Sequence, residues 1–331
     1  MKRLYTVIFI LVVLLGFGFY QEKQPHKINP NHTPTVGILQ LTEHPALDAI
    51  HKGIIDGLKE SGYTPGKNIN IDFQNAEGDQ GNLKTMSSKF ATENVDMSIG
   101  ITTPSAQVLA NTVKTAPLIL GAITDPKSAG LVDSNEHPGR QVTGVSDFPP
   151  MKEELKLIKE IMPNLHTLGV IYTSSDDSAT SQYHQFVKLC KEEHVNVKGY
   201  SISNTNDLNQ VATEMVQHVD AVYVPNDNTV ASAIQTLVNV ANTRNVPVFP
   251  TASTVVKQGA LATIGLNQYK LGVQTGKMAA RVLKGANPED MPIEKLSHGD
   301  LAINLGQAKK LGIEIPDYLI KEAKRNGVIY K

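Results

Sequence analysis

The 331 residues of this chain exceed what one ordinary domain core holds, so we expect two domains. Hydrophobic residues make up 40% and charged residues 19%, which is typical of a folded protein and excludes a mainly disordered one. The formal net charge is -1, from 31 Lys+Arg against 32 Asp+Glu, and this balance argues against a nucleic-acid partner.

The first twenty residues have the pattern of a membrane-targeting segment. Lys2 and Arg3 precede an apolar run over 4–20, which as a helix spans roughly 25 Å, near the lower limit for crossing a bilayer. A signal peptide and a short anchor both fit. We favour an uncleaved anchor, because the segment has no A-x-A-like cleavage site and no cysteine for a lipid. The body should then lie outside the cell, joined to the anchor by a polar tether over 21–33.

From residue 34 the sequence alternates short β-branched runs with segments that carry apolar residues at helical spacing, the pattern of an α/β fold. The first pair is a strand over 35–39 and a helix over 45–61, in which Leu47, Ile50 and Ile54 share one face. We predict further strands over 69–73, 97–101 and 117–120, and helices over 81–93 and 104–112. Together these elements form one sheet with covering helices.

A second series of the same build follows Pro149-Pro150. After a helix that ends at residue 162, it has strands over 167–172, 196–200, 221–224 and 246–249, with helices over 178–193, 207–218 and 229–242. A strand over 261–264 and a helix over 269–283 come next, and we assign this helix to the first lobe. The chain then crosses between the lobes more than once, which makes a hinge of several strands.

The predicted fold is therefore two Rossmann-like lobes with parallel sheets, joined by a multi-strand hinge. Lobe 1 comprises residues 34–146 and 267–298, and lobe 2 comprises residues 147–266. Residues 299–331 form a C-terminal tail that spans the lobes. The single cysteine, Cys190, falls within a helical pattern, and we expect a small buried side chain there.

Ligands of open parallel sheets bind outside the carboxyl ends of the strands, so the residues after each strand are the candidate site. In lobe 1, Gln40 and Leu41 follow the first strand, and Thr102, Thr103 and Ser105 follow the third. The second group begins a helix, where free amides and hydroxyls suit an anion such as an α-carboxylate. The alternative is that these hydroxyls only cap the helix.

Carboxylates at the same edge would pair with a ligand's ammonium group, because an unpaired charge in a closed site is costly. Thr124 and Asp125 follow the fourth strand, and Asp147 and Phe148 lie where the chain leaves lobe 1. Asp125 is equally explained as a turn residue before Pro126, and Asp147 as a capping residue at the hinge.

Further ligand candidates follow the strands of lobe 2. They are Ser174, Ser175, Asp227, Asn228 and Thr251. The last three are also what helix N-caps would supply. We expect His44 and His184 to lie at the surface.

Seven stretches, taken together, carry a family resemblance. They are GILQLTEHPALDAIHKGIIDGL, GITTPSAQ, GAITDPKSAGLV, VTGVSDFPP, IYTSSDDSA, VPNDNTVAS and INLGQAKKLGIEIP. In these stretches the chain resembles the ABC transporter substrate-binding proteins of the tryptophan/tyrosine type, over essentially its whole body. The resemblance implies the type I periplasmic-binding-protein fold, no catalysis, and an aromatic amino acid delivered to an ABC permease with its ATPase.

The residues themselves predict only a small zwitterionic ligand. The chain has no Trp and 5% aromatic residues, so aromatic pocket walls are scarce. Phe148, Tyr172 and Leu41 are the candidates for such walls. Aromatic specificity therefore follows from the resemblance.

Other functions lack their motifs in this sequence. No G-x-G-x-x-G follows the first strand, and there is no G-x-S-x-G, H-E-x-x-H or cysteine pair, so we expect no enzyme, no cofactor and no metal. A transcription regulator with this sensor body would begin with a basic helix-turn-helix, where this chain has an apolar segment. The remaining alternative is a ligand-sensing receptor domain that is not coupled to transport. We expect the protein to be a monomer.

Overall fold

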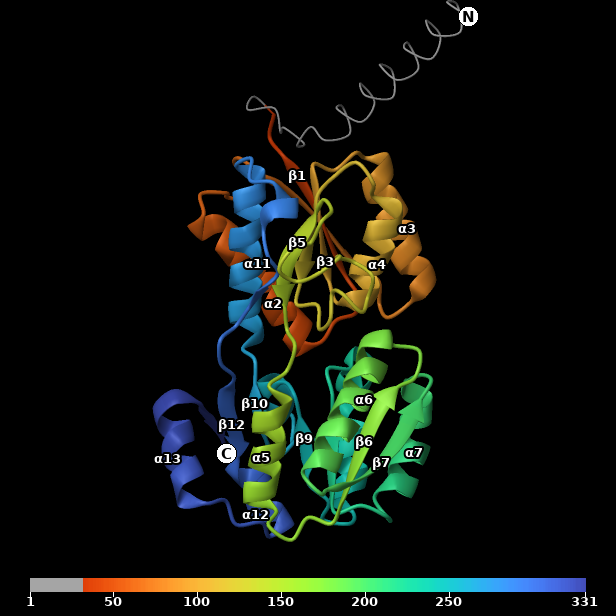
Figure 1. Cartoon of the computed structure of the whole chain (residues 1–331), viewed down its shortest axis with the longest axis vertical. Coiled ribbons are helices and arrows are strands. Elements are labelled where there is room, and N and C mark those ends of the chain that lie inside the picture. The colour runs from red at the N-terminus through yellow and green to blue at the C-terminus, as the bar shows by residue number, and fades with distance from the viewer. Residues whose placement is uncertain (1–31) are drawn as a thin grey trace, which may run out of the picture.

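The computed structural model describes residues 32–331, which form two lobes stacked along the long axis of the molecule (Figure 1). The predicted anchor over 1–20 and most of the predicted tether over 21–33 lie outside the described residues. Within residues 32–331, no helix combines the length and the apolar character needed to cross a membrane.

Lobe 1 is built on a six-stranded parallel sheet with strand order β11-β5-β4-β3-β1-β2. The strands are β1 (Thr35–Gln40), β2 (Asn70–Asn75), β3 (Met97–Ile101), β4 (Leu118–Gly121), β5 (Val142–Ser146) and β11 (Glu294–Lys295). Helices α2 (Pro45–Glu60) and α11 (Gln268–Leu283) cover one face, and α3 (Gln80–Thr92) and α4 (Thr103–Thr112) cover the other. Since both faces are covered, the central strands read as continuous apolar runs.

Helices α2 and α11 pack closely because glycines meet at their interface. A Cβ added to Gly272 would lie 2.1 Å from the backbone oxygen of Ile50, and one added to Gly276 would lie 2.3 Å from that of Ile54. The contacts advance in the same direction along both helices, so the helices are parallel. Both helices therefore begin at the same side of lobe 1, the side that faces lobe 2 (Figure 1).

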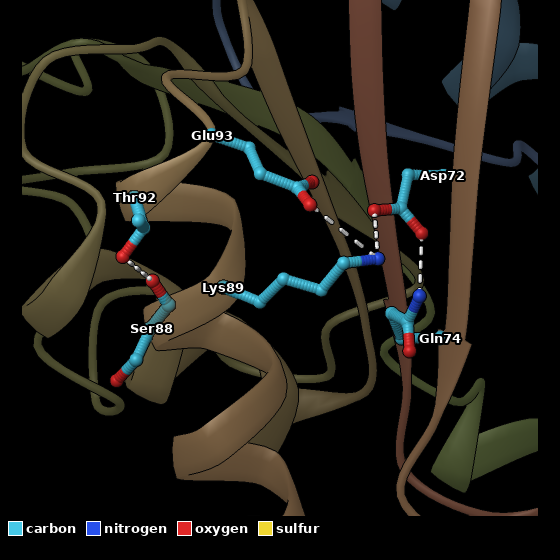
Figure 2. Close-up of polar contacts among 6 residues, drawn as sticks. All are labelled: Asp72, Gln74, Ser88, Lys89, Thr92 and Glu93. Atoms are coloured by element: carbon cyan, nitrogen blue, oxygen red, sulfur yellow. Dashed lines mark hydrogen bonds and ion pairs between the residues drawn. The ribbon is translucent and has the colours of Figure 1, made fainter.

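Polar side chains tie the outer edge of the lobe 1 sheet to helix α3. Figure 2 shows Lys89 of α3 beside Asp72 of β2, with Nζ 2.6 Å from Oδ2, and Glu93 3.9 Å from the same ammonium group. Burial raises the pKa of Asp72, but the hydrogen bonds from Lys89 and Gln74 outweigh burial and hold the pKa below its ordinary value. Charged side chains on an edge strand discourage pairing with a second chain.

Lobe 2 contains a four-stranded parallel sheet with strand order β7-β6-β8-β9. Its strands are β6 (Thr167–Thr173), β7 (Asn196–Ile202), β8 (Ala221–Val224) and β9 (Val248–Pro250). Its helices are α5 (Met151–Ile161), α6 (Asp177–Glu192), α7 (Leu208–Met215), α8 (Asn228–Ser232), α9 (Ile234–Asn242) and α10 (Ser253–Lys257). The helix predicted over 229–242 is thus two helices, because the backbone leaves helical geometry at Ala233, with φ -112° and ψ 22°.

A third sheet corrects the prediction for the C-terminal tail. Strand β12 (Asp300–Asn304) pairs antiparallel with β10 (Ala262–Gly265) and parallel with β13 (Val328–Tyr330). Helices α12 (Leu305–Leu311) and α13 (Asp317–Asn326) complete this region. Leu301 and Ile303 alternate on β12 and are buried in one cluster with Phe249 of lobe 2. From Leu301 onward, the segment that we expected to span both lobes therefore folds into lobe 2, where its apolar side chains find partners.

The chain passes between the lobes after β5, after β10 and after β11. Short 3-10 helices lie at Thr205–Asp207 in lobe 2 and at Pro288–Asp290 before β11. Because the crossings lie side by side, the two lobes can rotate about them as nearly rigid bodies.

Candidate functional site

The candidate site is a narrow cavity between the lobes, at the carboxyl ends of the strands of both parallel sheets. The volume open to the centre of a water-sized sphere is about 50 Å³, and side chains from both lobes line the cavity. Seven predicted ligand residues line it, and they are Thr102, Thr103, Thr124, Asp147, Asp227, Asn228 and Thr251. Residues that follow different strands, and that are far apart in sequence, therefore meet in one cavity, as expected for the carboxyl ends of parallel strands.

The other predicted ligand residues lie outside this cavity for local reasons. Gln40 Nε2 donates to Thr42 O and Asp48 Oδ1. Ser105 is fully buried, with its Oγ 3.4 Å from Thr102 Oγ1. The remaining residues make contacts elsewhere. Asp125 accepts hydrogen bonds from Ser128, and the ring of Phe148 lies 5.9 Å from Lys295 Nζ. Ser174 Oγ donates to Ile202 O, and Leu41 and Ser175 line a neighbouring pocket.

The lobe 1 wall presents a helix N-terminus held by unusual backbone geometry. Thr102 precedes α4 with φ +86°, a value that β-branched residues rarely adopt, and Ala122 follows β4 with φ +58°. Thr102 makes no side-chain capping hydrogen bond to the helix, so its hydroxyl is not used as a cap. Strained residues of this kind cluster at ligand sites. The free amides of α4 favour an anionic group in front of them.

Two carboxylates face this wall from the hinge and from lobe 2. Asp147 is buried, and its Oδ1 accepts a hydrogen bond of 2.9 Å from Thr124. Burial, with a smaller contribution from the charge of Asp176, raises the pKa of Asp147 to about 7. Burial and the charge of Asp227 likewise raise the pKa of Asp176 to about 6. Among the described residues the cavity lining contains no lysine or arginine, so a cationic ligand group would fit between these carboxylates.

Asp227 lines the same cavity but has its partners within the protein. Its Oδ2 accepts from the Thr173 backbone N–H, and its Oδ1 accepts from Thr173 Oγ1 at 2.9 Å and from Val230 N at 3.0 Å. It therefore caps α8 and holds the end of β6. Asp176 also caps a helix, since its Oδ1 accepts from Ser178 N and Ala179 N, but its Oδ2 has no such partner among the described residues.

His44 was expected at the surface, and this prediction is wrong. Only 8% of the residue is exposed, and its Nε2 lies 3.1 Å from Oδ1 of Asn228, which joins lobe 1 to lobe 2. Burial lowers the pKa of His44, so the neutral ring donates its Nε2–H to the amide oxygen. His44 lies in the loop between the end of β1 and the start of α2, so a search of the residues that follow each strand could have found it. His184, by contrast, is exposed on α6.

Sequence reasoning also missed Asn226. Its Nδ2 donates to the backbone oxygen of Asp147 at 3.0 Å, and its Oδ1 accepts from Thr251. This side chain fixes the hinge carboxylate against lobe 2.

The apolar part of the cavity is aliphatic. Ala46, Leu47 and Ile50 of α2 line it on one side, and Val224 and Val255 line it on the other. Among the described lining residues none is Phe or Tyr, so the expected aromatic walls are not there. Tyr172 instead stacks on Tyr183 at 4.5 Å between ring centres.

Known proteins share both the sequence and the fold. The model of the family described as ABC transporter substrate binding protein matches residues 35–326. The chain belongs to this family. It is 36% identical over 297 residues to the tyrosine-binding protein of Clostridioides difficile (strain R20291). The aligned region covers 90% of this chain and 86% of the relative. The predicted family and the two-lobe periplasmic-binding-protein fold are thereby confirmed, and the family is one of solute-binding proteins.

Two solved structures of similar identity differ in how well they superpose on this substrate-binding protein. An ABC domain from Streptococcus pneumonia in complex with L-Trp is 41% identical, with a TM-score of 0.87 over 90% of this chain and all of that one. A Clostridium difficile substrate binding protein described as ligand-free and open is 37% identical, with a TM-score of 0.70 over 90% of this chain and 99% of that one. The narrow cavity and the His44–Asn228 contact agree with a structure nearer to the L-Trp complex than to the open form.

Proposed function

We propose that this substrate-binding protein closes its two lobes around an aromatic amino acid and delivers it to an ABC permease. The proposal rests on the two walls of the cavity, because one presents hydrogen-bond donors and the other presents carboxylates. The N-terminus of α4 on lobe 1 faces two carboxylates, the buried Asp147 and the half-buried Asp176, across a cavity with aliphatic sides. An α-amino acid has the matching groups, a carboxylate and an ammonium on one carbon atom.

Each group of the ligand then has a partner in the cavity. The α-carboxylate lies at the amides and hydroxyls of Thr102 and Thr103. The α-ammonium lies between Asp147 and Asp176, where its positive charge favours the ionised form of two carboxyls whose pKa values are raised mainly by burial. The ligand side chain packs against the aliphatic surface of α2 and lobe 2. An aromatic side chain is supported by the relatives, one named a tyrosine-binding protein and one solved with L-Trp.

The ligand stabilises the closed form because it bridges groups on both lobes. The closed form is the state that the permease and its ATPase recognise, and the protein acts as a monomer at the extracellular face of the membrane. Residues 1–20 hold it there as an anchor and residues 21–33 serve as a tether, or the body is secreted if the segment is cleaved.

Isothermal titration of the purified protein with the twenty amino acids tests the ligand assignment. We expect Trp or Tyr to bind with a Kd in the micromolar range or below. Binding of none of the twenty below about 1 mM would refute the assignment. Uptake of the bound amino acid by cells that lack the protein tests the transport role. Unchanged uptake would favour a sensor that does not serve a permease.

A further inference from the structure

Gln268, the first residue of α11, places one amide group in the aliphatic part of the cavity. The close packing of α11 on α2 sets Gly272 against Ile50. One turn earlier on both parallel helices, the same register sets Gln268 beside Ala46 and Leu47. All three of these residues line the cavity, and Gln268 is only 6% exposed. A buried polar group among aliphatic neighbours needs a hydrogen-bond partner.

The protein satisfies only one side of this amide. Gln268 Nε2 donates to the backbone oxygen of Leu266 at 3.3 Å. A backbone oxygen only accepts, so this contact fixes the orientation of the amide and leaves Oε1 on the other side. Among the described residues no group donates a hydrogen bond to Gln268 Oε1. The free oxygen is therefore available to a donor inside the cavity.

We propose that Gln268 Oε1 determines the specificity of the site by accepting a hydrogen bond from the ligand's side chain. This inference rests on the proposed function and narrows it to ligands whose ring carries an N–H or O–H group, such as an indole or a phenol. A ring without a donor leaves the buried oxygen unpaired, and sites built around such a bond discriminate strongly against it. The aliphatic wall then holds the ring by contact area alone, which explains how an aromatic ligand is selected without aromatic side chains.

The test compares matched ligand pairs by titration calorimetry. L-Tyr and L-Phe differ by one hydroxyl, and L-Trp and 3-benzothienyl-L-alanine differ by an N–H replaced with sulfur. In the unaltered protein we expect the donor-bearing member of each pair to bind about tenfold more tightly or better, as the cost of an unpaired buried acceptor requires. In Gln268→Met, and in Gln268→Ala as a second variant, we expect both ratios to fall close to one, with L-Phe bound at least as well as before.

Gln40→Met is the matched control. Gln40 is also buried, and its Oε1 also lacks a hydrogen-bond partner in the described part of the chain, but it lies outside the cavity. This variant should leave both ratios unchanged.

Two results would overturn the inference. The first is a ratio near one for both pairs in the unaltered protein, which needs no variant. The second is an equal loss for all four ligands in the Gln268 variants, which would mean that the remaining Nε2–H serves the α-carboxylate instead. If the unaltered protein bound none of the four ligands, the proposed function itself would fail, and this outcome is distinct from the other two.

Discussion

The two walls of the cleft offer a ligand opposite chemistry. Lobe 1 presents hydrogen-bond donors at the start of α4, held by the strained backbone of Thr102. The hinge and lobe 2 present acceptors, Asp147 and Asp176, whose pKa values are raised mainly by burial, and no lysine or arginine is among the described residues that line the cavity beside them. Either wall alone resembles an ordinary strand end that leads into a helix. Only closure brings the donors and the acceptors to one cavity, so recognition depends on both walls together.

Asp147→Asn should have the largest effect on ligand affinity, because it removes a carboxylate from one of the two walls. We expect the Kd for the amino acid to rise about 100-fold, because one partner of a buried charge pair is removed. The melting temperature without ligand should stay the same or rise, since a buried carboxylate is lost. Titration calorimetry and thermal denaturation measure the two effects. Asp125→Asn, which changes a turn residue outside the cavity, should leave affinity unchanged, and an equal loss in both variants would contradict the assignment of Asp147.

Gly272→Ala tests whether the lobe 1 wall is set by the packing of α11 on α2. The new methyl group would lie 2.1 Å from the Ile50 backbone oxygen, so one helix must move. We expect a loss of about 1–3 kcal/mol in stability, seen as a melting temperature lower by several degrees. Lys277→Ala on the exposed side of the same helix should change it little. An unchanged melting temperature in Gly272→Ala would show that the helices separate without cost.

The pH dependence of binding should distinguish the two walls, because only the wall that contains Asp147 and Asp176 has carboxyl groups that titrate near neutral pH. As the pH falls from about 7 to 5, Asp147 and then Asp176 take up protons, and the ligand's ammonium must displace them. Affinity should therefore fall by at least about tenfold over this range. Asp147→Asn should flatten the profile. Stability without ligand should change in the opposite direction, because a raised pKa in the folded state favours the protonated protein and this contribution is lost as the pH rises through 7.

The His44–Asn228 contact joins the walls directly, and its removal should have a smaller effect. His44→Ala and Asn228→Ala should each raise the Kd about fivefold, the worth of one hydrogen bond. The double variant should be no worse than either single one, because both remove the same contact. His184→Ala, at an exposed position, is the control. Additive losses in the double variant would mean that the two side chains act separately.

Lys89→Ala should have the smallest effect. The pair with Asp72 lies on the outer edge of lobe 1, where the lysine side chain is 42% exposed. Exposed pairs contribute less than about 1 kcal/mol, and this one is far from both walls in sequence and sheet order. Thermal denaturation and titration should both give values near those of the unaltered protein. A clear change in affinity would show that the edge of the sheet is coupled to the cleft.

The residues predicted from strand ends line the cavity where the chain continues straight into the cleft, and lie outside it where the chain turns aside. Thr124 and Asp147 line the cavity, whereas Asp125, next to Thr124, turns back to bind Ser128. The loop that holds Ser174 and Ser175 was expected to contribute those hydroxyls, but its cavity residue is Asp176. An aspartate just before a helix is a familiar N-cap. An N-cap uses one carboxylate oxygen, so the other oxygen of Asp176 stays available for a ligand, and this could have marked the residue as a candidate.

The sequence by itself determined the α/β alternation, the two sheets, the return of α11 to lobe 1 and the polar strand ends, because periodicity and turn chemistry are local properties of the chain. Only the tertiary structure decided which polar side chains meet. The burial of His44 against Asn228, the meeting of Asp147 and Asp176 in one cavity and the free oxygen of Gln268 all depend on how two lobes and two glycine-packed helices come together. Those distances between remote residues are not written in any local pattern.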